Sequence, residues 1–329
     1  MASRIVFTAK QRVELESFPD PHPGPGEVRV RAVCSLMSTG TENIAFNRAF
    51  DTGTHWERWA GQYPFYPGYA MVGHVDEVGA AVEGLATGAM VACRPPHASH
   101  AILPAAECVP VPPGIEPRLA AWFALAKIAF VGARAADYRA GERVLVIGAG
   151  PVGQMSVRWA HVAGAQTIVV VDPAAVRLEM ARAGGATATI AASAANIGSD
   201  VRTASGGHLP PKVIDTTGNT DVFAQALALV GDRGRLVLLG DSGRPGQQHL
   251  TSEFITRGLT IVGAHDSHIP RADEPGVYQL FFDLLRDGRF RLDGLNTHVF
   301  PPGRCVDAYV LANARREETM GIFFDWAGG

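Results

Sequence analysis

The chain lacks the cysteine pairs that bind structural zinc. Its 329 residues contain four cysteines, and none belongs to a Cys-x-x-Cys pair: Cys34, Cys93, Cys108 and Cys305. Structural zinc sites are built from such closely spaced pairs. The spacing therefore excludes a finger-like zinc site and predicts four reduced thiols, most of them buried as small hydrophobic groups.

Long hydrophobic runs and a strong charge of one sign are also missing. The longest apolar stretches are strand-sized or are interrupted by Arg, Gly or Pro, so we expect no transmembrane helix. The N-terminal stretch MASRIVFTAKQRVELE carries charges every few residues, which is unlike a signal peptide. The net charge of −3, with no basic run, argues against a nucleic-acid partner. These features predict a cytoplasmic protein that binds neither membrane nor nucleic acid.

The chain is long enough for two domains, and its composition changes near residue 118. The hydrophobic content of 47% is sufficient for large buried cores. Residues 1–118 are rich in Val, Gly and Pro, and EVRVRAVC (27–34) and YAMVGHVDEVG (69–79) alternate as strands do. Turn-forming stretches such as PHPGPGE (21–27) separate them. Residues 1–118 are therefore predicted to form an all-β domain.

Residues 119–270 alternate between helical and strand-like segments. A helix is predicted over 118–138, and helices over 151–165 and 174–186 follow the first two strands. Five apolar stretches predict buried parallel strands: 143–150, 167–172, 212–217, 235–240 and 259–264. This order predicts an α/β fold with a doubly wound parallel sheet. Residues 271–329, with helices at 276–288 and 306–316 and a strand at 319–326, are expected to return to the first domain.

The segment GAGPVG (148–153) carries a G-x-G-x-x-G motif between a predicted strand and a predicted helix. Gly148 permits a tight turn, Gly150 lets the backbone approach a pyrophosphate, and Gly153 lets the helix pack on the strand. The helix N-terminus then offers N–H groups to the phosphates. Further cofactor contacts are expected from Pro151 and Val152 in the motif and from Thr217 after a later strand.

An acid follows the motif at the expected distance. Asp172 ends the strand TIVVVD, about 20 residues after the glycines. A carboxylate there accepts hydrogen bonds from both ribose hydroxyls and repels a 2′-phosphate, so NAD(H) is predicted rather than NADP(H). Arg177 lies nearby and can hold a 2′-phosphate; the alternative is that Arg177 is a solvated helix residue.

Along nearly its full length the chain resembles the medium-chain dehydrogenase/reductase superfamily. The resemblance rests on PGYAMVGHVDEVG (67–79), GERVLVIGAGPVGQ (141–154), VDPAAVRLEMARAGGA (171–186) and LTIVGA (259–264), which follow the order of the family. It implies a GroES-like catalytic β-domain formed by both chain ends and a Rossmann domain between them. It also implies an active site in the cleft, a small-molecule substrate and a homodimer.

The ligands of the zinc-dependent members do not carry over. Ser38 stands nearest the first ligand cysteine, Tyr69 and Ala70 replace the His and Glu of Gly-His-Glu, and Leu125 lies near the third ligand position. The lobe with four clustered cysteines is absent from the sequence. The chain therefore resembles a zinc-lacking branch, which includes proteins similar to bacteriochlorophyllide dehydrogenases and to sugar and natural-product dehydrogenases. No metal site is predicted.

Other groups must replace the zinc, which polarises the substrate oxygen in the resembled enzymes. Lys127 interrupts an apolar helix, which suits acid–base work; alternatively, its amine reaches water while its stem lies on the core. Tyr69 can donate its phenol to the substrate, or it can simply fill the space of the metal. Glu42 can act as a base or pair with Lys127, or it can cap a helix beginning near Asn43.

Four residues are predicted to contact the substrate. Ser38 and Thr41 lie in SLMSTGTE, Trp56 lies in a polar insert (47–62) expected to cover the cleft, and His265 follows the last Rossmann strand. A surface position is the alternative for His265 and the expectation for His97, because only geometry makes a histidine catalytic.

The main prediction is a zinc-independent, NAD(H)-dependent oxidoreductase that interconverts a secondary alcohol and a ketone. The polar insert and the family resemblance favour a polyhydroxylated, cyclic or natural-product substrate. Two alternatives remain open. One is an NADPH-dependent reductase of quinones or activated C=C bonds; the other is a nucleotide-binding protein without turnover.

Overall fold

The computed structural model describes residues 1–328 and contains two compact units. Unit 1 consists of Met1–Ala124, Pro275–Asp287 and the C-terminal segment from Leu295. Unit 2 consists of Leu125–Glu274 and Gly288–Gly294. The chain therefore enters unit 2 twice, and both units are made of separate pieces of sequence.

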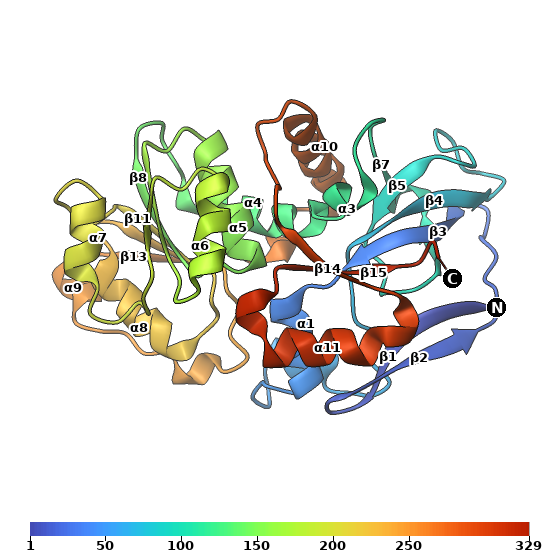
Figure 1. Ribbon diagram of the computed structural model, residues 1–329, viewed down its shortest axis with the longest axis horizontal. Coiled ribbons are helices and arrows are strands. Elements are labelled where there is room, and N and C mark those ends of the chain that lie inside the picture. The colour runs from blue at the N-terminus through green and yellow to red at the C-terminus, as the bar shows by residue number, and fades with distance from the viewer. Residues whose placement is uncertain (329) are drawn as a thin grey trace. The chain divides into compact units, whose positions relative to one another are not determined.

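Unit 1 is built on a mixed sheet in which the two ends of the chain meet. Its strands follow the order β14-β15-β3-β4-β5-β7, with β6 also paired to β3. Because β15 pairs antiparallel with β3, the C-terminal strand completes a sheet that is otherwise mainly N-terminal (Figure 1). The strands are β3 (Glu27–Leu36), β4 (Met71–Val78), β5 (Met90–Cys93), β6 (His100–Pro104), β7 (Val109–Pro110), β14 (Asn296–Phe300) and β15 (Gly321–Asp325), and a separate antiparallel pair is β1 (Ala2–Ala9) and β2 (Arg12–Phe18).

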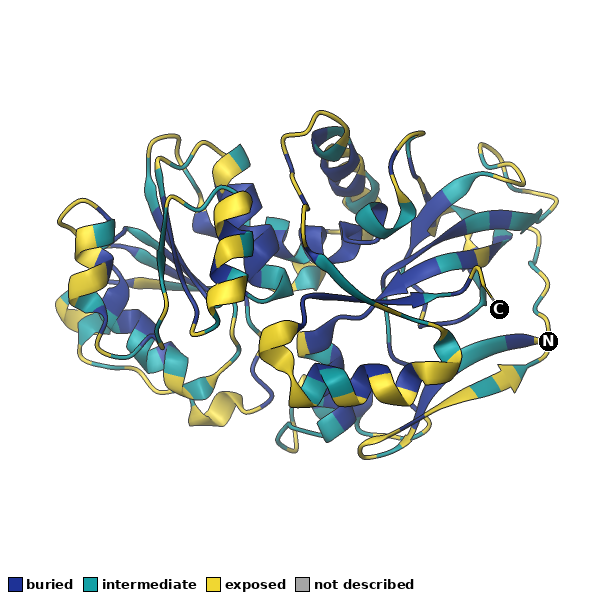
Figure 2. Ribbon diagram, in the orientation of Figure 1, coloured by how far each residue is buried: buried dark blue, intermediate teal, exposed yellow. Residues whose placement is uncertain are grey.

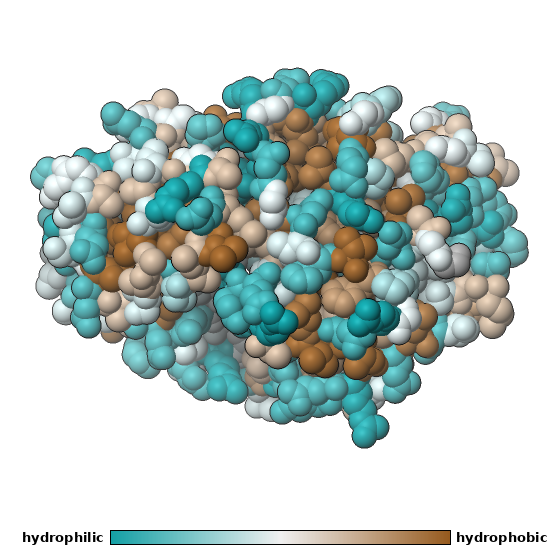
Figure 3. Space-filling view, in the orientation of Figure 1, coloured by the Kyte–Doolittle hydropathy of each residue, from teal (hydrophilic) through white to brown (hydrophobic). Residues whose placement is uncertain are grey.

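Helices of unit 1 pack against its strands and complete its hydrophobic core. Phe7 packs against Tyr309 of the last helix, with ring centroids 5.0 Å apart, and against Phe46 at 5.2 Å. Val306 and Val310 of that helix are more than half exposed, and Figure 3 shows apolar side chains around it. The helices are α1 (Thr39–Asn47), α2 (His55–Ala60), α3 (Pro117–Ala120), α10 (Glu274–Arg286) and α11 (Cys305–Ala314).

Unit 2 contains a six-stranded parallel sheet in the order β10-β9-β8-β11-β12-β13. This order, which reverses direction at the first strand, is that of dinucleotide-binding α/β domains. The strands are β8 (Arg143–Ile147), β9 (Thr167–Val171), β10 (Ala188–Ile190), β11 (Lys212–Asp215), β12 (Arg235–Leu238) and β13 (Thr260–Gly263). The five predicted strands are confirmed. The short edge strand β10 was not predicted, because its three residues lie in a run of small residues without strand-like alternation.

Helices cover the parallel sheet. The helices are α4 (Phe123–Ala136), α5 (Pro151–Val162), α6 (Ala175–Ala183), α7 (Gly198–Ala204), α8 (Thr220–Leu229) and α9 (Glu253–Thr256). Helices α5 and α6 lie side by side against β8, β9 and β10, and α5 is far more buried than α6 (Figures 1 and 2). The fold is α/β, with a GroES-like unit and a Rossmann unit, as predicted.

The helix predicted over 118–138 forms as two helices, α3 and α4. Pro117–Ala136 spans 20 residues with a mean hydropathy of 1.5, and it is the one stretch among residues 1–328 long and apolar enough to cross a membrane. Of its most apolar window, 67% is buried inside the protein. A buried core helix has this same apolar character, which accounts for the composition of the stretch.

Helix α5 fastens residues 288–294 to unit 2. The Trp159 ring lies 4.9 Å from that of Phe290. Arg158, which is fully buried, donates a hydrogen bond to the carbonyl of Arg291. Because neutral carbonyls replace water around its guanidinium, burial lowers the pKa of Arg158 to about 10.

Candidate active site

The glycine-rich turn between β8 and α5 requires two of its three glycines. Gly148 has a φ of +91°, and a Cβ on it would lie 2.8 Å from the Thr216 hydroxyl. A Cβ on Gly153 would lie 1.9 Å from the carbonyl oxygen of Gly148, so helix α5 can approach the strand only with glycine there. Around Gly150 the nearest atom is Nη1 of Arg177, at 3.8 Å from a built Cβ. The backbone at Gly150 is therefore open to a close ligand.

The N-terminus of α5 is suited to an anion. Gly150 is the N-cap, no side chain caps the helix, and Pro151 stands at its first position with Val152 next. The first N–H groups of a helix have no partner within it and carry the positive end of its dipole. With the Arg177 guanidinium close to this turn, the residues present fit the pyrophosphate of a dinucleotide.

Asp172 is held at the end of β9 by the backbone. Its two carboxylate oxygens accept hydrogen bonds of 2.8 Å from the N–H groups of Ala149 and Ala174. The carboxylate is 6% exposed and each oxygen keeps a second acceptor site. Its contact with a ribose remains a prediction, but the carboxylate is fixed beside the glycine-rich turn where that contact requires it.

Thr217 supports the turn rather than presenting a free hydroxyl. Its hydroxyl and its N–H both donate to Oδ1 of Asp215, at 2.7 and 2.8 Å. Its methyl group lies 2.9 Å from the place of a Cβ on Gly148. The predicted contact between Thr217 and the cofactor is therefore restricted to its backbone or its methyl group in this arrangement.

The buried carboxyl of Asp215 is expected to make the stability of the folded protein depend on pH. Burial raises the pKa of its carboxyl from 3.8 to about 6, opposed by the Thr217 hydrogen bonds. The folded protein thus binds this proton more tightly than the unfolded chain, so stability falls as pH rises from about 4 to about 6 and then levels off. Asp215→Asn keeps an oxygen acceptor and removes this pH-dependent contribution to the free energy of unfolding, which is at most about 3 kcal/mol.

The measurement is thermal unfolding of the cofactor-free protein from pH 4 to 7.5. The midpoint of Asp215→Asn is expected to rise relative to the wild type over that pH window. An exposed control, Asp221→Asn, should follow the wild type. A difference between Asp215→Asn and wild type that does not change with pH would contradict the assignment.

Three residues predicted for the site form one hydroxyl cluster in unit 1. The Tyr69 phenol donates to Ser38 Oγ at 2.5 Å and lies 3.4 Å from Thr41 Oγ1. Ser38 is the N-cap of α1, and Tyr69 precedes β4, so two separate elements bring the hydroxyl groups together. This juxtaposition places a ready proton donor at positions where the resembled zinc enzymes have ligands.

The surroundings of Tyr69 favour its protonated form. Burial raises the pKa of the phenol, opposed by the hydrogen bonds to Ser38 and Thr41 and by the charge of Arg94. The Arg94 guanidinium lies 5.1 Å from the centre of the Tyr69 ring. A phenol of this kind is a hydrogen-bond donor and a general acid at neutral pH rather than a base.

Glu42 is enclosed within unit 1, where its carboxylate already has partners. Its Oε1 accepts from the N–H of Ser38 at 2.7 Å, and Oε2 accepts from Tyr309 at 2.5 Å. Helix α1 begins at Thr39 rather than near Asn43 as predicted, so Glu42 reaches back to the N-cap from within the first turn. The structural alternative for Glu42 is favoured, because its oxygens are already occupied by donors.

Lys127 has charged neighbours that the sequence did not indicate. Its amine is 1% exposed and lies 2.7 Å from Oε1 of Glu274 and 3.0 Å from Oδ1 of Asp266, both in unit 2. The prediction of an apolar environment is wrong, and the amine does not reach water as the alternative supposed. Lys127 is a buried cation compensated by two carboxylates, and it holds the segment after β13 against α4.

The remaining histidine and tryptophan predictions turn out differently. Trp56 is 3% exposed and lies in helix α2, so it is not part of an exposed polar cover; its indole N–H has no hydrogen-bond partner among residues 1–328. His265 is exposed and bonds locally to Ser267. His97, expected at the surface, is fully buried against Gly68. No sequence signal marked His97, because the residues that enclose it are distant in the chain.

The four positions that would hold catalytic zinc do not fit the metal. The hydroxyl groups of Ser38 and Tyr69 are hydrogen-bonded to each other, while the buried side chains of Ala70 and Leu125 have no ligand atom. Zinc in proteins takes about four N, S or O ligands in a tetrahedron. Of these four residues, only Ser38 and Tyr69 carry a polar side-chain atom, and in both it is a hydroxyl oxygen.

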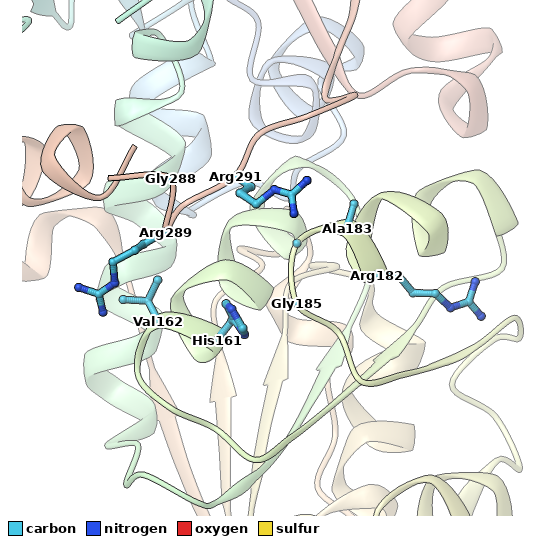
Figure 4. Close-up of a pocket in the computed structure, with 9 residues that line it drawn as sticks. His161, Val162, Arg182, Ala183, Gly185, Gly288, Arg289 and Arg291 are labelled. Atoms are coloured by element: carbon cyan, nitrogen blue, oxygen red, sulfur yellow. The ribbon is translucent and has the colours of Figure 1, made fainter. Parts of the chain in front are cut away.

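A pocket of about 520 Å³ in unit 2 lies at the C-terminal end of α5, opposite the glycine-rich turn (Figure 4). Its lining includes His161, Arg182, Arg289 and Arg291. Arg182 pairs with Glu179 and Arg291 pairs with Asp293. His161 and Arg182 lie in the last turns of α5 and α6, where basic side chains compensate the helix dipoles.

The chain is similar to known dehydrogenases. Residues 151–283 match the family model described as "Zinc-binding dehydrogenase". The chain is 27% identical to D-guloside 3-dehydrogenase of Escherichia coli (strain K12) over 242 residues, which cover 68% of this chain and 69% of that protein. It is 26% identical to L-threonine 3-dehydrogenase of Pyrococcus abyssi over 337 residues, which cover 91% and 92%.

Solved structures share the whole fold. A structure assigned to the zinc-binding dehydrogenases, from Sinorhizobium meliloti 1021 and bound to NADP, has a TM-score of 0.84 and 19% identity and covers 99% of both chains. An alcohol dehydrogenase from E. coli CFT073 complexed with NADH has a TM-score of 0.81 and 20% identity, covering 98% and 99%. The family match supports the resemblance to the dehydrogenases over residues 151–283, and the solved structures show the shared fold. The family match at 151–283 does not include positions 38, 69, 70 and 125.

Proposed function

We propose that this protein is a zinc-independent, NAD(H)-dependent dehydrogenase that interconverts a secondary alcohol and a ketone. The observation that carries the proposal is the hydrogen bond between Tyr69 and Ser38, at positions where the resembled enzymes hold zinc. The glycine-rich turn and Asp172 supply the fit to a dinucleotide. The name of the D-guloside 3-dehydrogenase relative supports a polyhydroxylated cyclic substrate.

In the proposed mechanism the Tyr69 hydroxyl binds the reacting oxygen of the substrate. Held by the glycine-rich turn and Asp172, NAD(H) would supply the hydride in reduction and accept it in oxidation. In ketone reduction Tyr69 donates its proton to the substrate oxygen as negative charge develops there. Because burial raises the pKa of the phenol, Tyr69 carries this proton near neutral pH. Ser38 and Thr41 accept from the phenol in this structure. After Tyr69 has given its proton to the substrate, their hydroxyl groups can donate hydrogen bonds to its oxygen, and a proton from water restores the phenol. Arg94, over the ring, stabilises the transient phenolate charge.

Metal removal tests the central claim. Because residues 38, 69, 70 and 125 offer no tetrahedral ligand set, turnover is expected to be unchanged after incubation with EDTA or 1,10-phenanthroline. The assay follows NADH at 340 nm with a panel of methyl glycosides and polyols, and metal content is measured in parallel. One zinc per chain, with turnover lost on chelation and restored by zinc, would overturn the proposal.

Cofactor preference is tested at Asp172. The dissociation constant of the wild type is expected to be lower for NADH than for NADPH. Asp172→Asn loses charge-assisted bonds to the ribose and should bind NADH about tenfold more weakly. Asp221→Asn, at the exposed start of α8, is the matched control. Tighter binding of NADPH by the wild type would instead favour the quinone or enone reductase alternative and a role for Arg177.

A further inference from the structure

A buried chain of polar side chains runs through unit 1 behind the hydroxyl cluster. His97 Nδ1 lies 2.8 Å from Ser35 Oγ, and His97 Nε2 lies 3.2 Å from Oε2 of Glu42. The side chains of His97 and Glu42 are both 0% exposed. A polar chain this deeply buried requires that every member be hydrogen-bonded.

The donors of this chain point in one direction. The indole N–H of Trp326, which can only donate, bonds to Ser35 Oγ at 2.9 Å. The hydroxyl hydrogen of Ser35 is then available for Nδ1 of His97, which leaves the His97 hydrogen on Nε2 and facing the Glu42 carboxylate. In this order all four groups are hydrogen-bonded.

Three donors converge on Glu42, and one of them belongs to the hydroxyl cluster. Oε2 accepts from His97 and Tyr309, and Oε1 accepts from the backbone N–H of Ser38. Burial and the nearby charge of Glu42 raise the pKa of Tyr309 well above its usual value, so its hydroxyl stays a donor. Glu42 is thus fixed from one side by His97 and Tyr309, and it fixes the N-cap residue Ser38 from the other.

A second contact joins His97 to Tyr69 through the backbone. Gly68 has a φ of +101°, and a Cβ on it would lie 2.7 Å from the His97 ring. The N–H of His97 also donates to the carbonyl of Pro67 at 2.8 Å. The imidazole therefore lies directly against the turn that orients Tyr69, in addition to its route through Glu42.

We propose that His97 is a positioning residue of the active site. Through Glu42 it fixes Ser38, and through Gly68 it fixes the turn before Tyr69, so that the Tyr69 hydroxyl is held in one place. The inference rests on the proposed role of Tyr69 as the group that handles the substrate oxygen. The catalytic contact belongs to Tyr69, and His97 touches neither substrate nor cofactor.

The first test is the protonation of the His97 ring in the wild-type protein. Two-bond ¹H–¹⁵N correlation spectra of protein labelled with ¹⁵N-histidine are expected to show His97 as a neutral Nε2–H ring, assigned by its loss in His97→Gln. A ring protonated at Nδ1, singly or together with Nε2, would contradict the donor order. This measurement needs neither substrate nor turnover.

The second test compares two substitutions of similar size. In His97→Gln the side-chain amide nitrogen takes the place of Nε2 and can still donate to Glu42, whereas in His97→Asn the amide reaches only the Ser35 side. His97→Asn is expected to lower kcat about tenfold to a hundredfold with little change in KM, because a misplaced acid reduces the chemical step. His97→Gln should retain most of kcat. His100→Gln, three residues away and not bonded to Glu42, is the control.

A structural readout separates this inference from the proposed function. The ¹³Cζ resonance of Tyr69, in tyrosine-labelled protein, is expected to move in His97→Asn and in Tyr309→Phe but not in His97→Gln. If Tyr69→Phe keeps its turnover while the Tyr69 resonance moves in His97→Asn, the proposed function is wrong and the positioning role stands. If Tyr69→Phe loses turnover while His97→Asn matches wild type in kcat and in the resonance, the positioning role is wrong.

Discussion

Tyr69→Phe is expected to lower kcat by about a hundredfold or more in both reaction directions. The substitution removes the hydroxyl that donates to the substrate oxygen and keeps the ring beneath Arg94. Binding of NADH should be unchanged, because the glycine-rich turn belongs to unit 2. Stopped-flow measurement of a single turnover, with NADH titrated by fluorescence, separates the two quantities.

Tyr66→Phe is the matched control for this prediction. Its hydroxyl also lies in unit 1 but accepts from Nη2 of Arg4 at 2.9 Å, away from the hydroxyl cluster. We expect near wild-type kcat for Tyr66→Phe. Equal rates for Tyr69→Phe, Tyr66→Phe and wild type would remove Tyr69 from the mechanism.

Lys127→Met is expected to destabilise unit 2 by about 3 kcal/mol. It leaves Glu274 and Asp266 facing a buried apolar group, and the value lies at the lower end for a broken buried pair because both carboxylates are partly exposed. The measurement is the urea midpoint of the protein with and without NADH. A double variant with Glu274→Gln should recover part of the loss, since one stranded charge is then removed.

The same variant decides whether Lys127 is catalytic. If Lys127 only holds the segment after β13, kcat per folded molecule should change little in Lys127→Met. Lys212→Met, at the start of β11, provides a control for loss of a lysine from unit 2. A hundredfold fall in kcat with an unchanged urea midpoint would restore the original interpretation of Lys127 as an acid–base group.

The cofactor turn could be predicted because its information is local. Strand, glycines and helix follow one another within a few residues, and the clashes a Cβ would make at Gly148 and Gly153 involve groups of the same motif or the neighbouring strand end. The juxtaposition of Ser38, Thr41 and Tyr69 could also be predicted, but only through the family resemblance, since 31 residues separate Ser38 from Tyr69.

The surroundings of single charged residues could not be predicted. The carboxylates that hold Lys127 lie 139 and 147 residues further along the chain, and nothing near Lys127 indicates them. His97 was expected at the surface because that is the default for a histidine whose spatial neighbours the sequence does not show. In the structure it is buried beside Ser35 of β3 and Glu42 of α1, which are far from it in sequence.

The return of residues 288–294 to unit 2 bears on how that unit can be isolated. A protein consisting of residues 125–274 alone would contain every strand of the parallel sheet and the entire cofactor turn. It would nevertheless lack Phe290, leaving the Trp159 ring with only one of its two aromatic neighbours, and it would lack the Arg291 carbonyl that accepts from buried Arg158. A stable fragment would need residues 288–294 joined to it by a short linker. This segment follows residues 125–274 in the sequence but packs against α5.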